Sequence, residues 1–223
     1  MKKIGKRLLC LGNILLVGFV IWTILVRNID VQPWGVNGTE IGFATMNTWF
    51  HQFTGVHLVI YTITDWMGLV PIFVCMVFAG MGCAQWMKRR SLFKVDYDIV
   101  FLGIYYAVVI FAYLIFEMIP VNYRPILIDG VMEVSYPSST TLLVLGVMPT
   151  LIEQVNRRAK TEIVRKIVSG FVMAFSIFMV LGRLIAGVHW LTDIVGAIML
   201  SEGVFFVYRA AILLYNDGHN WKA

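Results

Sequence analysis

The chain is dominated by apolar runs that are long enough to cross a bilayer. A membrane-spanning helix needs roughly 20 mostly apolar residues, because each residue rises about 1.5 Å through a hydrocarbon core about 30 Å thick. Five runs meet this requirement: Leu8–Val26, Gly68–Met87, Ile99–Ile119, Ile167–Ala186 and Ile194–Tyr215. A sixth run, Thr140–Ile152, is shorter and spans only if the same helix also takes in residues 137–139 and a polar turn behind. The pattern predicts an all-α fold, a six-transmembrane helical bundle.

The long connection between the first two runs, Arg27–Trp66, has a different pattern. Four apolar residues recur in it at helical spacing: Phe43, Met46, Phe50 and Phe53. Such spacing is typical of an amphipathic helix that lies in the membrane surface with its apolar side toward the lipid. We therefore expect an interfacial helix in the first outer loop, serving either as an aromatic anchor or as a gate for substrate. The whole chain, residues 1–223, is expected to form a single membrane domain.

Composition and charge placement agree with a membrane protein and set its orientation. Only 14% of the residues are charged, against about 25% in soluble proteins. Cytoplasmic loops retain Lys and Arg, and of the 18 Lys and Arg residues all but Arg27, Arg124 and Arg183 fall on one side of the predicted bundle. Both termini are therefore expected in the cytoplasm, most simply across a bacterial plasma membrane. The net charge of +5 is divided among short loops, so we expect no nucleic-acid partner.

Polar residues gather where the bilayer disfavours them, at the outer ends of the last four runs. Arg183 interrupts an apolar run, which costs about 2.5–3.5 kcal/mol unless the charge is paired or wetted. His189 and Asp193 are four residues apart, so on one helix the carboxylate can orient the imidazole. A histidine held in this way can act as a nucleophile or base. The alternative is a buried ion pair that links helices without chemistry.

A second group of residues suits an anion. Pro137 favours the start of a helix, and Ser138, Ser139 and Thr140 follow it. Their hydroxyl and backbone N–H groups lie at the positive end of the expected helix, where phosphate binds readily. Arg124 precedes a proline on the same side and can fork onto phosphate oxygens. Ordinary N-capping by serine is the alternative, but the arginines make a phosphate site the better interpretation.

The spacing of these residues resembles the type 2 phosphatidic acid phosphatase (PAP2) superfamily, which also includes soluble vanadium haloperoxidases. The resemblance covers roughly residues 99–215, which we expect to be a PAP2-like catalytic core. Family members carry a lysine with six residues between it and an Arg-Pro pair, a Pro-Ser-Gly-His stretch, and a Ser-Arg pair followed by His and Asp. Arg183, Gly187, His189 and Asp193 keep the spacing of the third motif, with Gly182 in place of its serine.

The resemblance implies a role for each matching residue. His189 would be the nucleophile that forms a phosphohistidine, and Asp193 its orienting partner. Arg124, Arg183 and Ser138 would hold the phosphate oxygens. No cofactor or metal is implied.

Two positions depart from the family pattern. Glu117 stands where the family has its lysine, and Thr140 stands where it has the histidine that protonates the leaving group. A positioned general acid accelerates a reaction by about 10²–10⁴-fold, and a threonine hydroxyl cannot replace it at neutral pH. A phosphate that leaves from a diphosphate needs this help less than an alkoxide does. Substitute proton donors on the same side are Glu117, Asp129, Glu133, His51 and His57.

The sequence therefore favours a membrane lipid-phosphate or lipid-diphosphate phosphatase that acts at the outer face. The expected substrates are a lipid phosphate or a polyprenyl diphosphate, taken from the bilayer. Glu117 keeps a different class open, because a carboxylate in a phosphate pocket repels a dianion. That class is a non-catalytic relative that binds a lipid or a partner protein. A lipid phosphotransferase, which passes the phosphoryl group to an acceptor other than water, is a further alternative.

Overall fold

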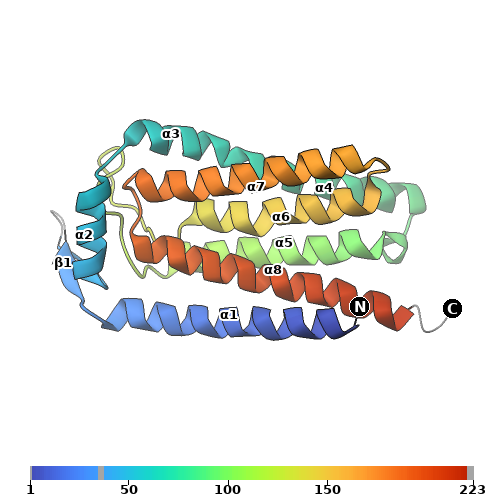
Figure 1. The fold of residues 1–223 in the computed structure, drawn as a ribbon, viewed down its shortest axis with the longest axis horizontal. Coiled ribbons are helices and arrows are strands. Elements are labelled where there is room, and N and C mark those ends of the chain that lie inside the picture. Colours follow the sequence, from blue (N-terminus) through green and yellow to red (C-terminus); the bar gives the residue numbers. More distant parts are fainter. Residues whose placement is uncertain (1, 35–37, 220–223) are drawn as a thin grey trace.

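Long helices run lengthwise through the structure, a computed structural model that describes residues 2–34 and 38–219 (Figure 1). Most of the described residues are helical, and two short antiparallel strands add to the expected all-α fold. In chain order the elements are α1 (Lys2–Asn28), β1 (Gln32–Trp34), β2 (Thr39–Ile41), α2 (Ala44–Thr54), α3 (Leu58–Met67), α4 (Leu69–Arg89), the 3₁₀ helix η1 (Leu92–Lys94), α5 (Tyr97–Met118), α6 (Ser139–Arg158), α7 (Glu162–Ile185) and α8 (Leu191–His219).

Within the described part of the chain, five helical segments are long and apolar enough to cross a membrane. They are Lys2–Asn28, Leu58–Arg89, Tyr97–Met118, Glu162–Ile185 and Leu191–Asn216. Each contains or closely overlaps one of the apolar runs found in the sequence. The second begins earlier than expected, because residues 58–66 were assigned to the outer connection and instead form α3. The chain stays helical through Gly68, whose backbone N–H donates to Thr64 O and Asp65 O at 3.0 Å, so α3 continues into α4.

Helix α6 lies among the other helices and contacts α4, α5, α7 and α8. Because protein surrounds it, α6 does not need the apolar surface of a lipid-facing helix, and it is not among the five apolar segments. It is also longer than the apolar run Thr140–Ile152, since its polar last turns find partners. Arg158 pairs with Asp98 at 2.8 Å, and Glu153 pairs with Arg209 at 2.8 Å.

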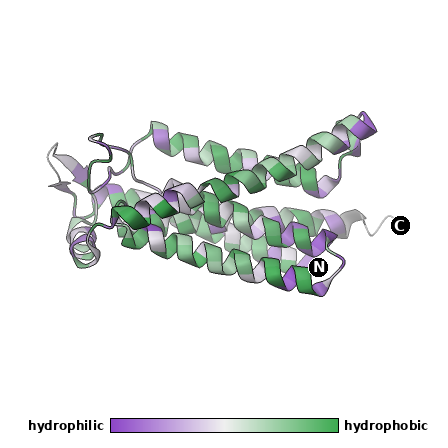
Figure 2. Ribbon diagram, turned by 90° about the horizontal axis from the view of Figure 1, so that it is seen from above, coloured by the Kyte–Doolittle hydropathy of each residue, from purple (hydrophilic) through white to green (hydrophobic). Residues whose placement is uncertain are grey.

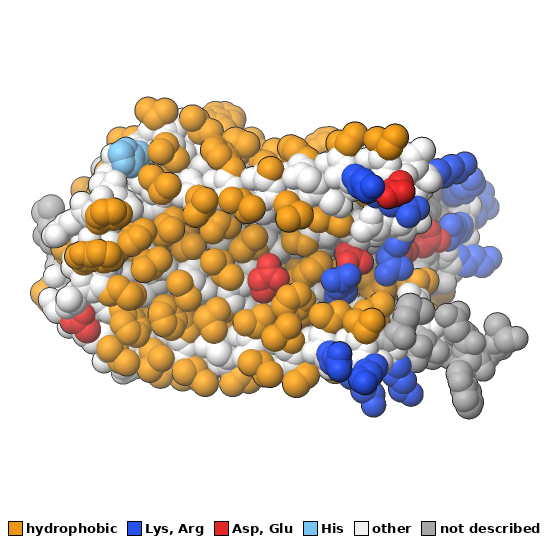
Figure 3. Space-filling view, viewed as in Figure 1, with side chains coloured by type: hydrophobic (Ala, Val, Ile, Leu, Met, Phe, Trp, Pro, Cys, Tyr) orange, Lys and Arg blue, Asp and Glu red, His pale blue; other side chains and the backbone are white. Residues whose placement is uncertain are grey.

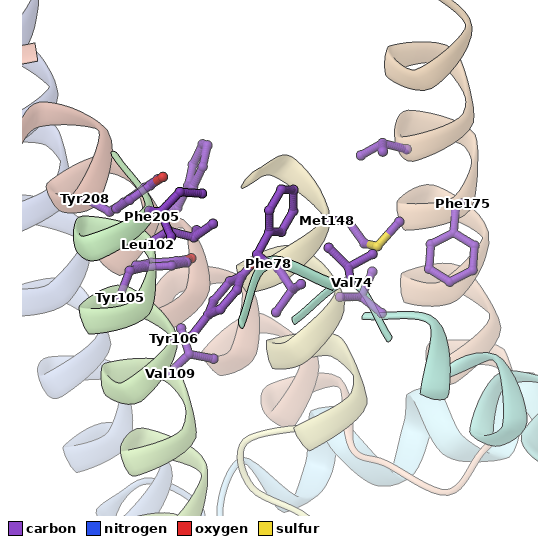
Figure 4. Packing of buried hydrophobic residues seen from close by; sticks show 14 of the residues in the cluster. Val74, Phe78, Leu102, Tyr105, Tyr106, Val109, Met148, Phe175, Phe205 and Tyr208 are labelled. Atoms are coloured by element: carbon purple, nitrogen blue, oxygen red, sulfur yellow. The ribbon is translucent and has the colours of Figure 1, made fainter. Parts of the chain in front are cut away.

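Buried aromatic and aliphatic side chains fill the space between the helices (Figure 4). Tyr105 and Tyr106 reach from α5 to α6, where their hydroxyls bond Gly146 O at 2.6 Å and Thr150 Oγ1 at 2.7 Å. Hydrophobic residues extend along the helices, and hydrophilic residues gather toward both ends (Figure 2). The two tyrosine hydroxyls therefore find partners inside the bundle, where lipid could offer them none.

The two ends of the bundle differ in construction. Lys and Arg side chains gather at the end that carries the N terminus (Figure 3). The opposite end, which we call the loop end, carries β1, the connection 119–138, the α7–α8 turn and α2 (Figure 1). Helix α2 lies across the bundle direction there, and all the candidate residues of the second and third motifs come to this end.

We expect Gly12→Leu to destabilise the fold. A side chain at Gly12 of α1 would start 2.9 Å from Gly203 O and 2.9 Å from Val207 Cγ2 of α8, so the two helices must separate. Overpacking of this kind typically costs about 1–3 kcal/mol, which thermal unfolding in detergent would detect. Gly80→Leu is the matched control, because nothing lies within 4 Å of its Cβ position. Equal unfolding midpoints for the two variants would contradict the close α1–α8 packing.

Candidate functional site

The turn between α7 and α8 brings the third-motif residues to the loop end. Arg183 lies in the last turn of α7, and His189 follows in the connection before α8. Gly187 makes the turn with a φ of 71°, and a Cβ there would lie 2.1 Å from Gly55 O. Only glycine tolerates both this left-handed backbone and this close approach. The turn therefore packs directly against the chain segment that leads into α3.

His189 is buried and oriented by a backbone carbonyl. His189 is only 3% exposed, and its Nδ1 lies 3.1 Å from Ser135 O. Because a carbonyl oxygen only accepts, Nδ1 donates to it, and the lone pair of the neutral ring then sits on Nε2. Burial, with Arg183 and Arg124 nearby, holds the pKa of His189 well below its usual value of 6.5. At neutral pH the ring is therefore uncharged, and the lone pair on Nε2 is free to accept a bond.

Asp193 lies on the Nδ1 side of that ring. Its Oδ2 accepts from the Trp190 backbone N–H at 2.9 Å and lies 3.7 Å from His189 Nδ1, while its Oδ1 accepts from Asn122 Nδ2 at 3.3 Å. The bond to Trp190 caps the start of α8. His189 precedes that helix, so the two residues do not share one helical face as the spacing suggested. Asp193 instead reaches back, fixing both the helix start and the imidazole side.

Two buried arginines face the same aromatic ring. The guanidinium carbons of Arg183 and Arg124 lie 5.0 and 5.6 Å from the centre of the Tyr61 ring, and Arg183 Nη2 lies 3.4 Å from His189 Nε2. Arg183 is 1% exposed and Arg124 is 7% exposed. Among the described residues, Arg183 Nε and Arg124 Nε and Nη1 are buried without a hydrogen-bond partner. Buried donors are normally satisfied, so these N–H groups indicate a site for an anion.

Each arginine already has one carboxylate partner. Asp65 Oδ1 lies 3.4 Å from Arg183 Nη1, and Glu133 Oε2 lies 2.9 Å from Arg124 Nη2. Glu133 was one of the substitute acids named from the sequence, whereas Asp65, Tyr61 and the Ser135 carbonyl were missed. Asp65 did carry a signal, because it is a single acidic residue within the apolar segment Leu58–Arg89, and such residues are commonly functional.

The start of α6 lies beside the same cluster. The Ser138 backbone N–H donates to Asp193 O at 3.2 Å, while its hydroxyl donates to Thr141 Oγ1 at 3.0 Å. The Thr140 methyl group lies 3.5 Å from the Cβ position of Gly68, at the α3–α4 junction. Ser138 is therefore brought to the site through its backbone, and Thr140 faces α3.

Glu117 and Ser139 lie in the wall of a small separate pocket, together with Ser135 and Tyr136. Glu117 is exposed in the last turn of α5. The ion pairs of Arg183 and Arg124 are made with Asp65 and Glu133 instead. Among the described residues, no three His, Cys, Asp or Glu side chains converge in a way that could hold a metal ion.

Comparisons with known proteins match this chain to one family and one solved fold. A family model described as the PAP2 superfamily matches residues 73–216. No curated protein matches the sequence. A solved structure, described as a transmembrane PAP2-type phosphatidylglycerolphosphate phosphatase from Bacillus subtilis, is similar with a TM-score of 0.63 and 12% identity. The similarity covers 92% of this chain and 96% of that chain, so the two share a fold over nearly their whole lengths.

We expect the wild-type protein to lose stability at acidic pH more steeply than His189→Asn. A histidine whose pKa is below 6.5 in the folded state binds its proton more weakly there than in the unfolded chain. Falling pH therefore favours unfolding, by up to about 1.4 kcal/mol per pH unit. Asparagine keeps an N–H at the Nδ1 position but cannot titrate. Thermal unfolding measured from about pH 8 to about pH 5 checks this, and parallel pH profiles would refute a depressed pKa.

Proposed function

This chain belongs to the PAP2 superfamily, and on that premise we propose that it is a membrane phosphatase that hydrolyses a lipid phosphate or lipid diphosphate through a phosphohistidine on His189. The observation that carries the proposal is the state of that ring. Nδ1 is committed to Ser135 O, and Nε2 lies 3.4 Å from a buried guanidinium that has an unpartnered N–H. A nucleophile and an anion-binding group therefore meet at one point.

The chemistry follows from these contacts. Nε2 of His189 attacks the phosphorus, and the bond from phosphorus to the leaving oxygen breaks with its electron pair on that oxygen. Arg183 and Arg124 hold the phosphoryl oxygens, where fixed donors stabilise the charge that develops in the transition state. The ring becomes positive when Nε2 bonds to phosphorus, and the Ser135 carbonyl and Asp193 carboxylate stabilise its Nδ1–H. Water then hydrolyses the phosphohistidine and releases phosphate.

The proposed topology has six spans, with α6 as the central one. Helix α2 lies at the outer surface of the same membrane. The gathering of Lys and Arg at the N-terminal end of the bundle (Figure 3) supports a cytoplasmic position for that end. The loop end then faces outward, with the catalytic core formed by residues 99–215 of one membrane domain. The charge bias suits a bacterial plasma membrane. The solved neighbour is described as acting on phosphatidylglycerolphosphate, which supports a lipid phosphate as the substrate class.

The residues at the two departing positions favour a diphosphate. Thr140 gives no proton at neutral pH, so an alkoxide would have to leave unprotonated, whereas a phosphate leaves readily as an anion. Glu117 lies outside the arginine pair, so its charge does not cancel that of Arg124 or Arg183. A polyprenyl diphosphate therefore fits the site better than phosphatidic acid does.

We expect His189→Ala to abolish phosphate release by the purified protein in detergent. Removing a covalent nucleophile typically costs at least about 10³-fold in turnover. Phosphate release is measured with a polyprenyl diphosphate and with phosphatidic acid, beside Glu40→Gln, an exposed position of β2 at the same end, as the control. If the wild type releases no phosphate from either lipid and His189→Ala is indistinguishable, the chain is a non-catalytic lipid- or partner-binding member of the family.

We also expect the polyprenyl diphosphate to be hydrolysed faster than phosphatidic acid. Cleavage of the monoester needs a proton donor, worth about 10²–10⁴-fold in rate, which the protein lacks at Thr140. Thr140→His should raise the kcat for phosphatidic acid more than the kcat for the diphosphate. Comparable turnover of the two lipids by the wild type would sink the leaving-group argument while leaving the phosphohistidine intact.

A further inference from the structure

One guanidinium separates Asp65 from the nucleophilic histidine. Arg183 Nη2 lies 3.4 Å from His189 Nε2, and Arg183 Nη1 lies 3.4 Å from Asp65 Oδ1. The two terminal nitrogens of one guanidinium therefore contact the imidazole Nε2 and the Asp65 carboxylate, one each. The side chain of Asp65 is 56% exposed, whereas those of Arg183 and His189 are each 1% exposed. Asp65 is thus a carboxylate that is open to solvent and also contacts the buried arginine beside His189.

The position of Asp65 depends on a close approach of α3 to α7. A Cβ at Gly182 would lie 2.7 Å from Thr64 Cγ2, so a side chain there would force Thr64, or α3 with it, to shift. Gly182 and Thr64 are the direct neighbours of Arg183 and Asp65 in sequence. A second contact, from the His57 backbone N–H to Ala186 O at 3.0 Å, fixes the start of α3. The glycine that replaces the family's serine is therefore what lets Asp65 meet Arg183.

The other nearby carboxylates are placed less well for this position. Asp193 lies on the Nδ1 side of the imidazole and is held by Trp190 and Asn122, so it faces away from phosphorus bound to Nε2. Glu133 pairs with Arg124, and Arg183 is the arginine that contacts Nε2. Asp65 also lies on the helix that faces Thr140, since the junction at Gly68 meets the Thr140 methyl group.

We propose that Asp65 is the general base that activates water for hydrolysis of the phosphohistidine, an inference that rests on the proposed function. The water oxygen attacks phosphorus while the Asp65 carboxylate accepts one of the water protons. The bond from phosphorus to Nε2 breaks, its electron pair returns to the imidazole, and inorganic phosphate leaves. Asp65 then releases its proton to solvent. An ionised carboxylate suits this half of the reaction, and a diphosphate substrate needs no protonated acid in the other half.

The test is the fate of the phosphohistidine in Asp65→Asn. With a polyprenyl diphosphate labelled in its terminal phosphate, this variant should form lipid product in a burst of about one equivalent and then stall. Steady-state phosphate release should fall by about 10²–10⁴-fold. The label should remain on the protein in an acid-labile, alkali-stable form, and it should be absent from Asp65→Asn/His189→Ala. Asp65→Glu should recover part of the hydrolysis rate.

Matched variants separate this role from general damage. Glu40→Gln removes an exposed carboxylate of β2 and should turn over like the wild type. Gly182→Ala should slow dephosphorylation by displacing α3, and Gly182→Ala/Thr64→Ser should restore it, because serine lacks the clashing Cγ2.

Three results would overturn the proposal. Asp65→Asn could turn over like the wild type, or it could lose turnover without accumulating label. The label could instead accumulate in Glu133→Gln, which would assign the base to the other arginine's partner. In each of these cases the wild type still releases phosphate, and only the role of Asp65 is lost. A wild type that neither releases phosphate nor takes up label refutes the phosphatase itself together with this step.

Discussion

The loop end of this protein is organised around the burial of one positive charge, that of Arg183. A guanidinium taken out of water costs several kcal/mol unless other groups replace its hydration, and Arg183 is 1% exposed. The fold compensates from three directions: the Asp65 carboxylate, the Tyr61 ring and the imidazole of His189. One N–H still lacks a partner. The compensation is therefore incomplete in a way that a bound anion would complete.

Holding that charge also fixes the elements around it. Helix α3 must lie close to α7 for Asp65 to reach Arg183, which requires glycine at 182 and again at 187, where the chain turns back against Gly55. This turn places His189 two residues before α8. The Asp193 carboxylate accepts from the Trp190 backbone N–H and so fixes where that helix begins. Packing, capping and the chemistry of the imidazole are thus consequences of a single local arrangement.

Hydropathy and local spacing predicted the parts of the fold that depend on neighbouring residues. The five apolar segments and the grouping of Arg183, His189 and Asp193 follow from these signals. Sequence could not predict that α3 continues into α4, because Gly68 is equally compatible with a loop. It also missed Asp65 and the Ser135 carbonyl, which reach the site from 118 and 54 residues away in the chain. Contacts of that kind arise from packing and leave no periodic pattern.

The departures from the family pattern become related once the helices are in place. Loss of a serine at 182 and loss of a histidine at 140 look independent in the sequence, yet both positions face α3. The smaller residue at 182 admits α3, and α3 carries a carboxylate to the arginine beside His189. A proton-transfer group can then come from α3 in place of α6. An ionised carboxylate accepts protons more readily than it gives them. Under the proposed mechanism, the proton-transfer group would therefore no longer protonate the leaving group and would instead take a proton from the attacking water. In the proposed mechanism, this exchange would slow the cleavage of a phosphate monoester and would favour a substrate whose leaving group is already a stable anion.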